Sequence, residues 1–233
     1  VLGTLRFSAA TLGFGALIGT LSFISFNLFV SSLKEGEASV NTMLFRLSFI
    51  VTSLLSIALL GESTGWAKWL GLALAAGAVC SVALDSRRYA RQGSRRAILF
   101  ATAALVCYGF NGFLFKVATL RGAEASGLSI VTTCTFGVLS VLVHLLPWGS
   151  LRFRISQMIV RHGLFIGFLQ AVAFNAILWS MGLGGEASVV IPILQLSFLL
   201  TAALAILSLK EPFHARKQLG FLLGILALVL LAL

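Results

Sequence analysis

The sequence has little charge and few acidic residues. Charged residues make up 10% of the 233 positions, and Asp and Glu together number 7, whereas charged residues alone are about 25% of a soluble domain. The hydrophobic share is 59%, and the mean hydropathy is +1.04. A chain of this kind lacks the polar residues that cover a water-soluble core. The composition therefore excludes a soluble domain and indicates an all-α integral membrane protein.

Clusters that would hold a metal or cofactor are also missing. The cysteines lie one by one inside apolar runs, where they act as small packing residues, and the histidines lie near the ends of different apolar runs. No GxxxxGK[ST] motif is present. We expect no metal and no cofactor. The net charge of +10 is concentrated in short connections between apolar runs, which is typical of membrane topology and not of nucleic-acid binding.

Eight apolar runs are long enough to be candidates for membrane helices, since a span needs about 20 apolar residues. Little of the chain is left over for a soluble domain. The longest polar stretch is residues 85–96, which we interpret as a basic linker. The predicted spans are residues 8–30, 38–60, 66–84, 97–119, 126–147, 160–182, 187–209 and 215–233.

A long internal repeat relates two of these regions. Residues 36–84 match residues 185–233 at a constant offset of 149, with 20 of 49 positions identical and the strings GEASV and LSF unbroken. The offset pairs the second predicted span with the seventh and the third with the eighth. The fourth and fifth spans have no partner, so we expect two further helices before residue 1 and ten in the full protein.

Ten helices in two repeats give five helices per repeat. Because five is odd, the two repeats cross the bilayer in opposite senses, which is the inverted-repeat architecture of many secondary transporters. We accordingly predict an N-terminal repeat over residues 1–84, the linker over residues 85–96 and a C-terminal five-helix repeat over residues 97–233.

The repeated segments resemble the EamA-type branch of the drug/metabolite transporter superfamily. The resemblance lies in EAS at the start of a helix, LGE or LKEPF at its end, and a glycine-rich apolar helix after it. It implies a basket of two five-helix halves around a central cavity, with transport that needs no ATP hydrolysis. One departure is that Pro192 in the second repeat corresponds to Met43 in the first.

Arg46 is the candidate binding residue that stands out, because it lies near the centre of a predicted span. A cationic side chain there costs about 2.5 to 3.5 kcal/mol on insertion scales, and all acidic residues of the chain lie at or near loops. One hypothesis is that Arg46 reaches the surface or pairs with an acid outside this chain. The other is that its guanidinium binds a carboxylate or phosphate of the cargo. Gln195 occupies the equivalent position in the second repeat.

Other polar residues inside spans complete the candidate site. Thr42 shares the stripe of Arg46 on its helix, while shared hydroxyls such as Ser48 and Ser197 are better explained by helix packing. Lys116 lies near a helix end and is expected to reach outward. The resemblance adds residues from the spans that line the family's cavity, although buried amides serve equally well as links between helices. These residues are Asn27, Tyr108, Asn111, Gln170, Asn175, Trp179 and Gln195.

We therefore predict a secondary transporter for a small metabolite, anionic or zwitterionic, in the cytoplasmic membrane. Its partners would be the substrate and the lipid bilayer, with no nucleic acid, and the sequence leaves monomer and homodimer open. The alternative is a membrane-embedded enzyme that acts on a lipid or small anion. Such an enzyme needs an acid, base or nucleophile at the depth of Arg46, so we expect no enzyme. The basic connections, including Lys34 and residues 85–96, are predicted to be cytoplasmic.

Overall fold

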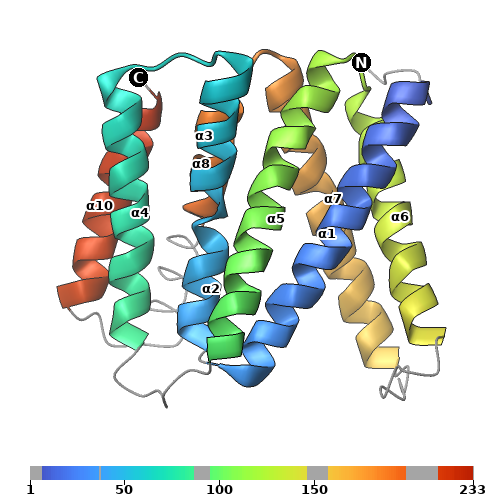
Figure 1. Ribbon diagram of the computed structural model, residues 1–233, viewed down its shortest axis with the longest axis horizontal. Helices are drawn as coiled ribbons and strands as arrows, with labels where there is room; N and C mark the ends of the chain where they lie inside the picture. The colour runs from blue at the N-terminus through green and yellow to red at the C-terminus, as the bar shows by residue number, and fades with distance from the viewer. Residues whose placement is uncertain (1–6, 37, 87–94, 146–156, 198–214, 233) are drawn as a thin grey trace. The chain divides into compact units, whose positions relative to one another are not determined.

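The computed structural model describes residues 7–36, 38–86, 95–145, 157–197 and 215–232, and every regular element in these ranges is a helix (Figure 1). The described part of the chain is therefore all-α, as predicted. The helices are α1 (Ala9–Glu35), α2 (Ala38–Arg46), α3 (Ser48–Leu60), α4 (Trp66–Ser86), α5 (Arg95–Leu120), α6 (Ala125–Leu145), α7 (Gln157–Gly182), α8 (Ala187–Gln195) and α10 (Ala215–Ala232).

Four segments are long and apolar enough to cross a membrane: α1, α5, and most of α6 and α7. Shorter apolar helices cover Leu44–Leu60, Trp66–Ser81 and Gln218–Leu231. These findings agree with a multi-pass membrane protein, while eight spans stay a prediction.

Helices lie in every predicted window, with one correction. The window 38–60 was predicted as a single helix, but the structure divides it into α2 and α3 at Leu47. In the window 187–209, residues 198–209 lie outside the described residues, as do residues 87–94 of the predicted linker.

The chain forms two compact units, which we call unit 1 and unit 2. Unit 1 contains Val1–Phe23 and Leu114–Gly185, and unit 2 contains Ile24–Phe113 and Glu186–Leu233. Helices α1 and α5 each contribute to both units. Each unit combines segments from both sides of the predicted linker.

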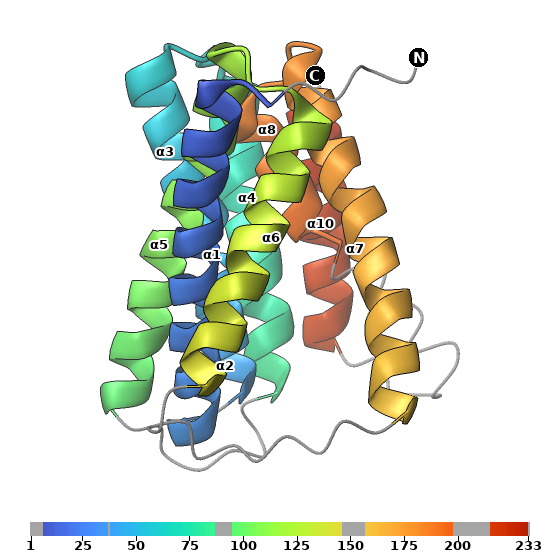
Figure 2. The same cartoon turned by 90° about the vertical axis from the view of Figure 1, so that its right-hand side faces the viewer.

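In unit 1, glycines let α1 approach α6 closely. A Cβ atom on Gly15 would lie 2.6 Å from the Val131 side chain, and one on Gly19 would lie 2.7 Å from the carbonyl oxygen of Thr132. Small residues at this four-residue spacing let the two helix backbones come close together. Helices α6 and α7 run in opposite directions beside each other (Figure 2).

In unit 2, α4 packs along α10. A Cβ atom on Gly71 would meet Leu231, and one on Gly77 would meet Leu223. The contact on α10 moves to lower residue numbers as the contact on α4 moves to higher ones, so the two helices are antiparallel, as Figure 1 also shows. These helices are the counterparts of each other in the internal repeat, and an inverted repeat requires this antiparallel arrangement.

Helix α3 of unit 2 also lies against α5. The Thr52 hydroxyl donates to the carbonyl oxygen of Gly109 at 2.7 Å. A Cβ atom on Gly112 would lie 2.6 Å from that hydroxyl, and one on Gly109 would lie 2.6 Å from the carbonyl oxygen of Ser48. Two glycines on one face of α5 thus let the backbones of the two helices come together.

Candidate functional site

The regular helix is interrupted between Arg46 and Ser48. Leu47 has φ −69° and ψ 0°, and its N–H donates to the carbonyl oxygen of Leu44 at 3.1 Å, while its own carbonyl oxygen accepts from Ile50 at 3.0 Å. Both bonds span three residues, which is the spacing of a 3₁₀ turn and not of an α-helix. Helix α2 therefore ends directly after Arg46.

The second repeat shows a helix end at the equivalent position. Helix α8 ends at Gln195, and Leu196 has φ −74° and ψ −4°. The N–H of Ser197 donates to the carbonyl oxygen of Leu194 at 3.0 Å, again over three residues. Leu196 lies 149 positions after Leu47, so both repeats end a regular helix at the same place. Discontinuous helices are a recurring element of transporter binding sites.

The two helix ends contact each other through Arg46 and Gln195. Arg46 Nη1 donates to the backbone carbonyl oxygen of Gln195 at 3.3 Å. That oxygen is available because the last carbonyl groups of a helix have no partner within it. The side chain of Gln195 is buried, and its Nε2 donates to Ser48 Oγ at 3.4 Å. The structure thus brings together Arg46 and the residue at its equivalent position in the second repeat.

The bond to Gln195 gives Arg46 a structural role that the sequence did not indicate. A neutral carbonyl satisfies one of the five N–H donors of a guanidinium, and the contact leaves the formal charge in place. Arg46 is half-buried. Its role in cargo binding stays a prediction.

Aromatic rings connect the region of Arg46 to α1 and α5. The ring of Phe45 stacks on Phe29 of α1, with centroids 4.4 Å apart, and lies 4.7 Å from the ring of Tyr108 on α5. Tyr108 therefore lies one side chain away from the end of α2. Such rings offer faces against which an organic cargo can pack.

The remaining predicted residues of unit 2 lie on three helices. Thr42 is half-buried on α2, one turn before Arg46. Asn111 is buried on α5, and Asn27 is exposed on α1.

Gln170, Asn175 and Trp179 lie on α7, in unit 1. Asn175 Nδ2 donates to Ser129 Oγ of α6 at 3.2 Å and to the carbonyl oxygen of Ala171 at 2.9 Å. This amide thus links two helices, which is one of the two roles that the sequence left open. Gln170 is exposed, and the Trp179 side chain is 61% exposed.

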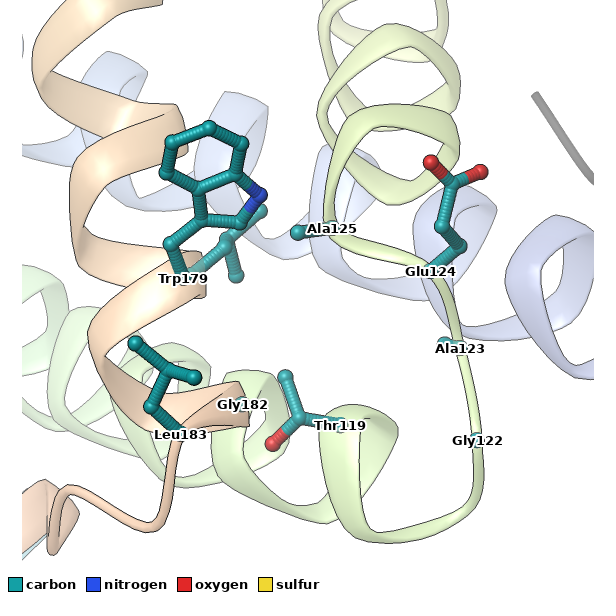
Figure 3. A pocket seen from close by; sticks show the side chains of 9 residues that line it. Thr119, Gly122, Ala123, Glu124, Ala125, Trp179, Gly182 and Leu183 are labelled. Carbon is teal, nitrogen blue, oxygen red and sulfur yellow. The ribbon is translucent and has the colours of Figure 1, made fainter. Parts of the chain in front are cut away.

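Trp179 lines a pocket of about 720 Å³ in unit 1. Figure 3 shows Trp179 of α7 and Leu183, which directly follows α7, on one side, and Ala125 at the start of α6 with Glu124 before it on the other. Thr119 at the end of α5 completes the wall. The pocket is mainly apolar and lies where three helix ends meet.

The expectation that Lys116 reaches outward is wrong. Its side chain is buried, and its Nζ donates to the carbonyl oxygens of Met181 at 3.2 Å and Gly185 at 2.6 Å. These acceptors lie at the C-terminal end of α7, where the helix dipole favours a cation. Lys116 therefore caps α7 instead of reaching toward the surface.

Sequence reasoning missed a polar cluster in unit 2, which we call the α3–α8 latch: Glu62, Ser63, Lys68, Glu186 and Ser188. Lys68 forms an ion pair with Glu186, and its Nζ also donates to Ser63 Oγ at 3.1 Å and to Ser188 Oγ at 3.2 Å. The backbone N–H and the hydroxyl of Ser63 each donate to the Glu186 carboxylate at 3.1 Å.

Glu62 completes this latch by capping α8. Its two carboxylate oxygens accept from the backbone N–H groups of Ala187 at 2.8 Å and Ser188 at 2.9 Å. The first N–H groups of a helix lack internal partners and carry partial positive charge, so a carboxylate there is stabilising. Glu62, the last residue of the LGE motif in the first repeat, thus caps the N-terminus of α8 in the second repeat.

The repeat contained a signal for the latch. Glu62, Lys68, Glu186 and Ser188 are each identical to the residue 149 positions away. Polar residues that persist among so many apolar substitutions are candidates for paired contacts.

Comparison with known proteins finds a family match over part of the chain and a similar fold. Residues 2–84 match the EamA-like transporter family, which confirms the resemblance noted in the sequence. A search of curated proteins found no match. A solved structure titled only "Crystal structure of protein" is similar, with a TM-score of 0.72, 16% identity, and coverage of 95% of this chain and 84% of that chain. At this identity the likeness concerns the fold alone.

Proposed function

Because residues 2–84 match the EamA-like transporter family, we propose that this multi-pass membrane protein is a secondary transporter. It moves a small metabolite across the cytoplasmic membrane and does not transform it. The observation that carries the proposal is the paired end of regular helix at Leu47 and Leu196. Irregular backbone inside a bilayer is tolerated where it faces protein or a cavity, and such places bind cargo in transporters.

The proposed cargo is anionic or zwitterionic. Arg46 supplies a planar, permanently charged fork that suits a carboxylate or phosphate, while Gln195 and Ser48 supply neutral hydrogen-bonding groups beside it. Tyr108 adds an aromatic face near the end of α2. The full proposed set is Arg46, Thr42, Asn27, Tyr108, Asn111, Gln170, Asn175, Trp179 and Gln195.

The proposal includes eight spans in this chain, arranged as parts of two inverted repeats. The antiparallel course of α4 and α10 supports it. A thiol reagent that cannot cross membranes tests the topology in intact cells, with single cysteines on a background without native cysteine. We expect Gly65→Cys, between α3 and α4, to be labelled and Lys34→Cys, near the end of α1, to be protected. Labelling of both or of neither contradicts the proposed topology.

Transport by the protein in proteoliposomes tests the function. The probes are lactate, glycerol phosphate, alanine and choline, which represent a monocarboxylate, a phosphate ester, a zwitterion and a cation. We expect uptake of at least one of the first three and none of choline. Arg46→Gln should abolish that uptake, and Arg46→Lys should restore it in part, because a point charge cannot form the two-pronged contact of a guanidinium.

The matched control is Arg121→Gln, which removes an exposed arginine from the connection after α5. It should transport as the parent does. Expression and melting temperature are measured for every variant. An Arg46→Gln protein that folds and transports normally contradicts a role of Arg46 in cargo binding. Uptake that favours choline contradicts the proposed cargo class.

A further inference from the structure

Arg46 and Gln195 are related by the internal repeat and also contact each other. We call two residues that lie 149 positions apart repeat mates. A two-fold rotation separates each residue from its mate by twice its distance from the axis. Mates can therefore touch only close to the axis. The bond between Arg46 and Gln195 places the axis between the ends of α2 and α8.

A second interface in unit 2 agrees with the same axis. Helices α4 and α10 are themselves repeat counterparts and run antiparallel. The repeat mate of Gly77 is Leu226. Gly77 approaches Leu223, which lies three positions from that mate. The contacts between the counterpart helices are thus also centred near repeat mates, as one two-fold axis through both interfaces requires.

Near this axis both repeats end a regular helix, but they differ in the last side chain of that helix. Leu47 and Leu196 each follow the last residue of a regular helix, and Ser48 and Ser197 follow them in turn. The guanidinium of Arg46 is charged and donates to the backbone of Gln195, whereas the side-chain amide of Gln195 is neutral and donates to Ser48. The two repeats therefore contribute unequal charge at equivalent helix ends.

We propose that the charge that selects the cargo acts from the repeat axis, so that either repeat can supply it. This inference rests on the proposed transport function and deepens it. The cargo has one anionic end, which faces the guanidinium, and one uncharged hydrogen-bonding end, which faces the amide of Gln195 and the hydroxyl of Ser48. Whether the first or the second repeat carries the arginine determines only the orientation of the cargo, that is, toward which repeat its anionic end points.

The structure gives a physical reason why the charge can be moved. In the present protein Arg46 donates to the carbonyl oxygen of residue 195, at the end of α8. Helix α2 ends at residue 46 in the same way. A guanidinium introduced by Gln195→Arg can therefore donate to the carbonyl oxygen of residue 46, because the two-fold rotation exchanges these two groups.

The experiment compares the parent with Arg46→Gln, Gln195→Arg and the exchange variant that combines both changes, using the four probes in proteoliposomes. Arg46→Gln should abolish uptake of the anionic probe, which means a loss of at least about tenfold, since it removes a charge-assisted hydrogen bond. The exchange variant should recover uptake to within about threefold of the parent. Gln195→Arg alone should lose uptake, because two cations then face each other at the axis.

The outcomes separate the two proposals. If Arg46→Gln folds and transports as the parent does, the proposed role of Arg46 fails. If Arg46→Gln loses uptake and the folded exchange variant does not recover it, the axis inference fails while the proposed function stands. Recovery by the exchange variant with the same order of preference among the probes supports the inference.

A second measurement covers the case in which the exchange variant does not fold. Arg46→Cys and Gln195→Cys are combined in a protein whose native cysteines are replaced, and the pair is treated with a short bifunctional thiol reagent. Mates at the axis should be cross-linked. The control pair is Arg46→Cys with Leu59→Cys, because Leu59 is exposed near the end of α3 and thirteen residues at the helical rise place it about 20 Å from Arg46; this pair should not be cross-linked. Absence of cross-linking between residues 46 and 195 in the folded protein, or equal cross-linking of the control pair, overturns the inference.

Discussion

The Ser53 hydroxyl donates a hydrogen bond to the backbone carbonyl oxygen of Ser188 at 3.2 Å. In a regular helix that oxygen would accept from the N–H of residue 192, but Pro192 has no N–H. A side chain of α3 thus supplies the donor that is missing within α8. The first repeat has Met43 at the position of Pro192, and the second has Ala202 at the position of Ser53. The position equivalent to Pro192 thus has no proline, and the position equivalent to Ser53 has no hydroxyl.

The first prediction is that Ser53 and Pro192 are energetically coupled. Ser53→Ala should lower the free energy of unfolding by about 1 kcal/mol, because a buried carbonyl loses its partner. In a Pro192→Met background the same change should cost little, since residue 192 then has an N–H of its own. Unfolding of the four proteins in detergent micelles gives the coupling directly. Equal costs in both backgrounds would refute it.

The second prediction concerns the cap of α8. Glu62→Gln should lower the free energy of unfolding by about 1.5–3 kcal/mol, the size of hydrogen bonds to a charged group. The amide can accept with one oxygen only, and its NH₂ group faces a backbone donor. Glu35→Gln is the control, since Glu35 is exposed at the end of α1. Thermal unfolding measures both, and equal small effects would show that the cap does not stabilise the protein.

The third prediction concerns the contact between α3 and α5. Gly109→Ala should destabilise the protein, because the new methyl group would meet the carbonyl oxygen of Ser48 and the side chain of Val51. Gly137→Ala, in α6, has no atom within 4 Å of the added Cβ and should be neutral or stabilising by about 0.5–1 kcal/mol, the gain in helix propensity. Melting temperatures in one detergent test the pair. Similar shifts for both variants would contradict close packing at Gly109.

The fourth prediction is a dependence of stability on pH that comes from Glu186. Burial of the carboxyl group raises its pKa, but hydrogen bonds from Lys68 and Ser63 and the charge of Lys68 lower it more, so the pKa lies below its ordinary value of 4.5. The folded protein therefore binds this proton more weakly than the unfolded chain. The stabilisation is complete above pH 4.5 and is lost as the pH falls from there through the folded pKa.

Melting curves between about pH 7 and pH 3 should show this loss in the parent. Glu186→Gln removes the titrating group, so its melting temperature should fall less over the same interval. Glu35→Gln is again the control and should follow the parent. A Glu186→Gln protein with the full pH dependence of the parent would assign the effect to another group.

Composition and apolar run length were sufficient to predict where the helices lie, because the cost of burying polar backbone in hydrocarbon leaves few alternatives to a helix. The interruption at Leu47 was not visible. Leu47 is an ordinary helix-forming residue, so local propensity predicts a helix that continues through it.

The sequence identified Arg46 and Gln195 as the unequal pair of the repeat, and the structure shows that they touch. The offset of 149 shows that the two residues are equivalent in the repeat, but it does not show how far apart they lie. Their contact could therefore not be predicted from the sequence. Lys116 illustrates the opposite case. Its position near a helix end suggested an exposed ammonium group, but the free carbonyl groups at the end of α7 bind it inside unit 1.

The cap that Glu62 forms on α8 makes the two halves of the sequence depend on each other. The carboxylate comes from the first half, and the backbone groups that it binds come from the second. Either half produced alone would leave the Glu62 carboxylate or the start of α8 without this partner. The halves therefore resemble the subunits of an obligate heterodimer that are joined by a linker. If they were synthesised separately, they would have to associate to become stable.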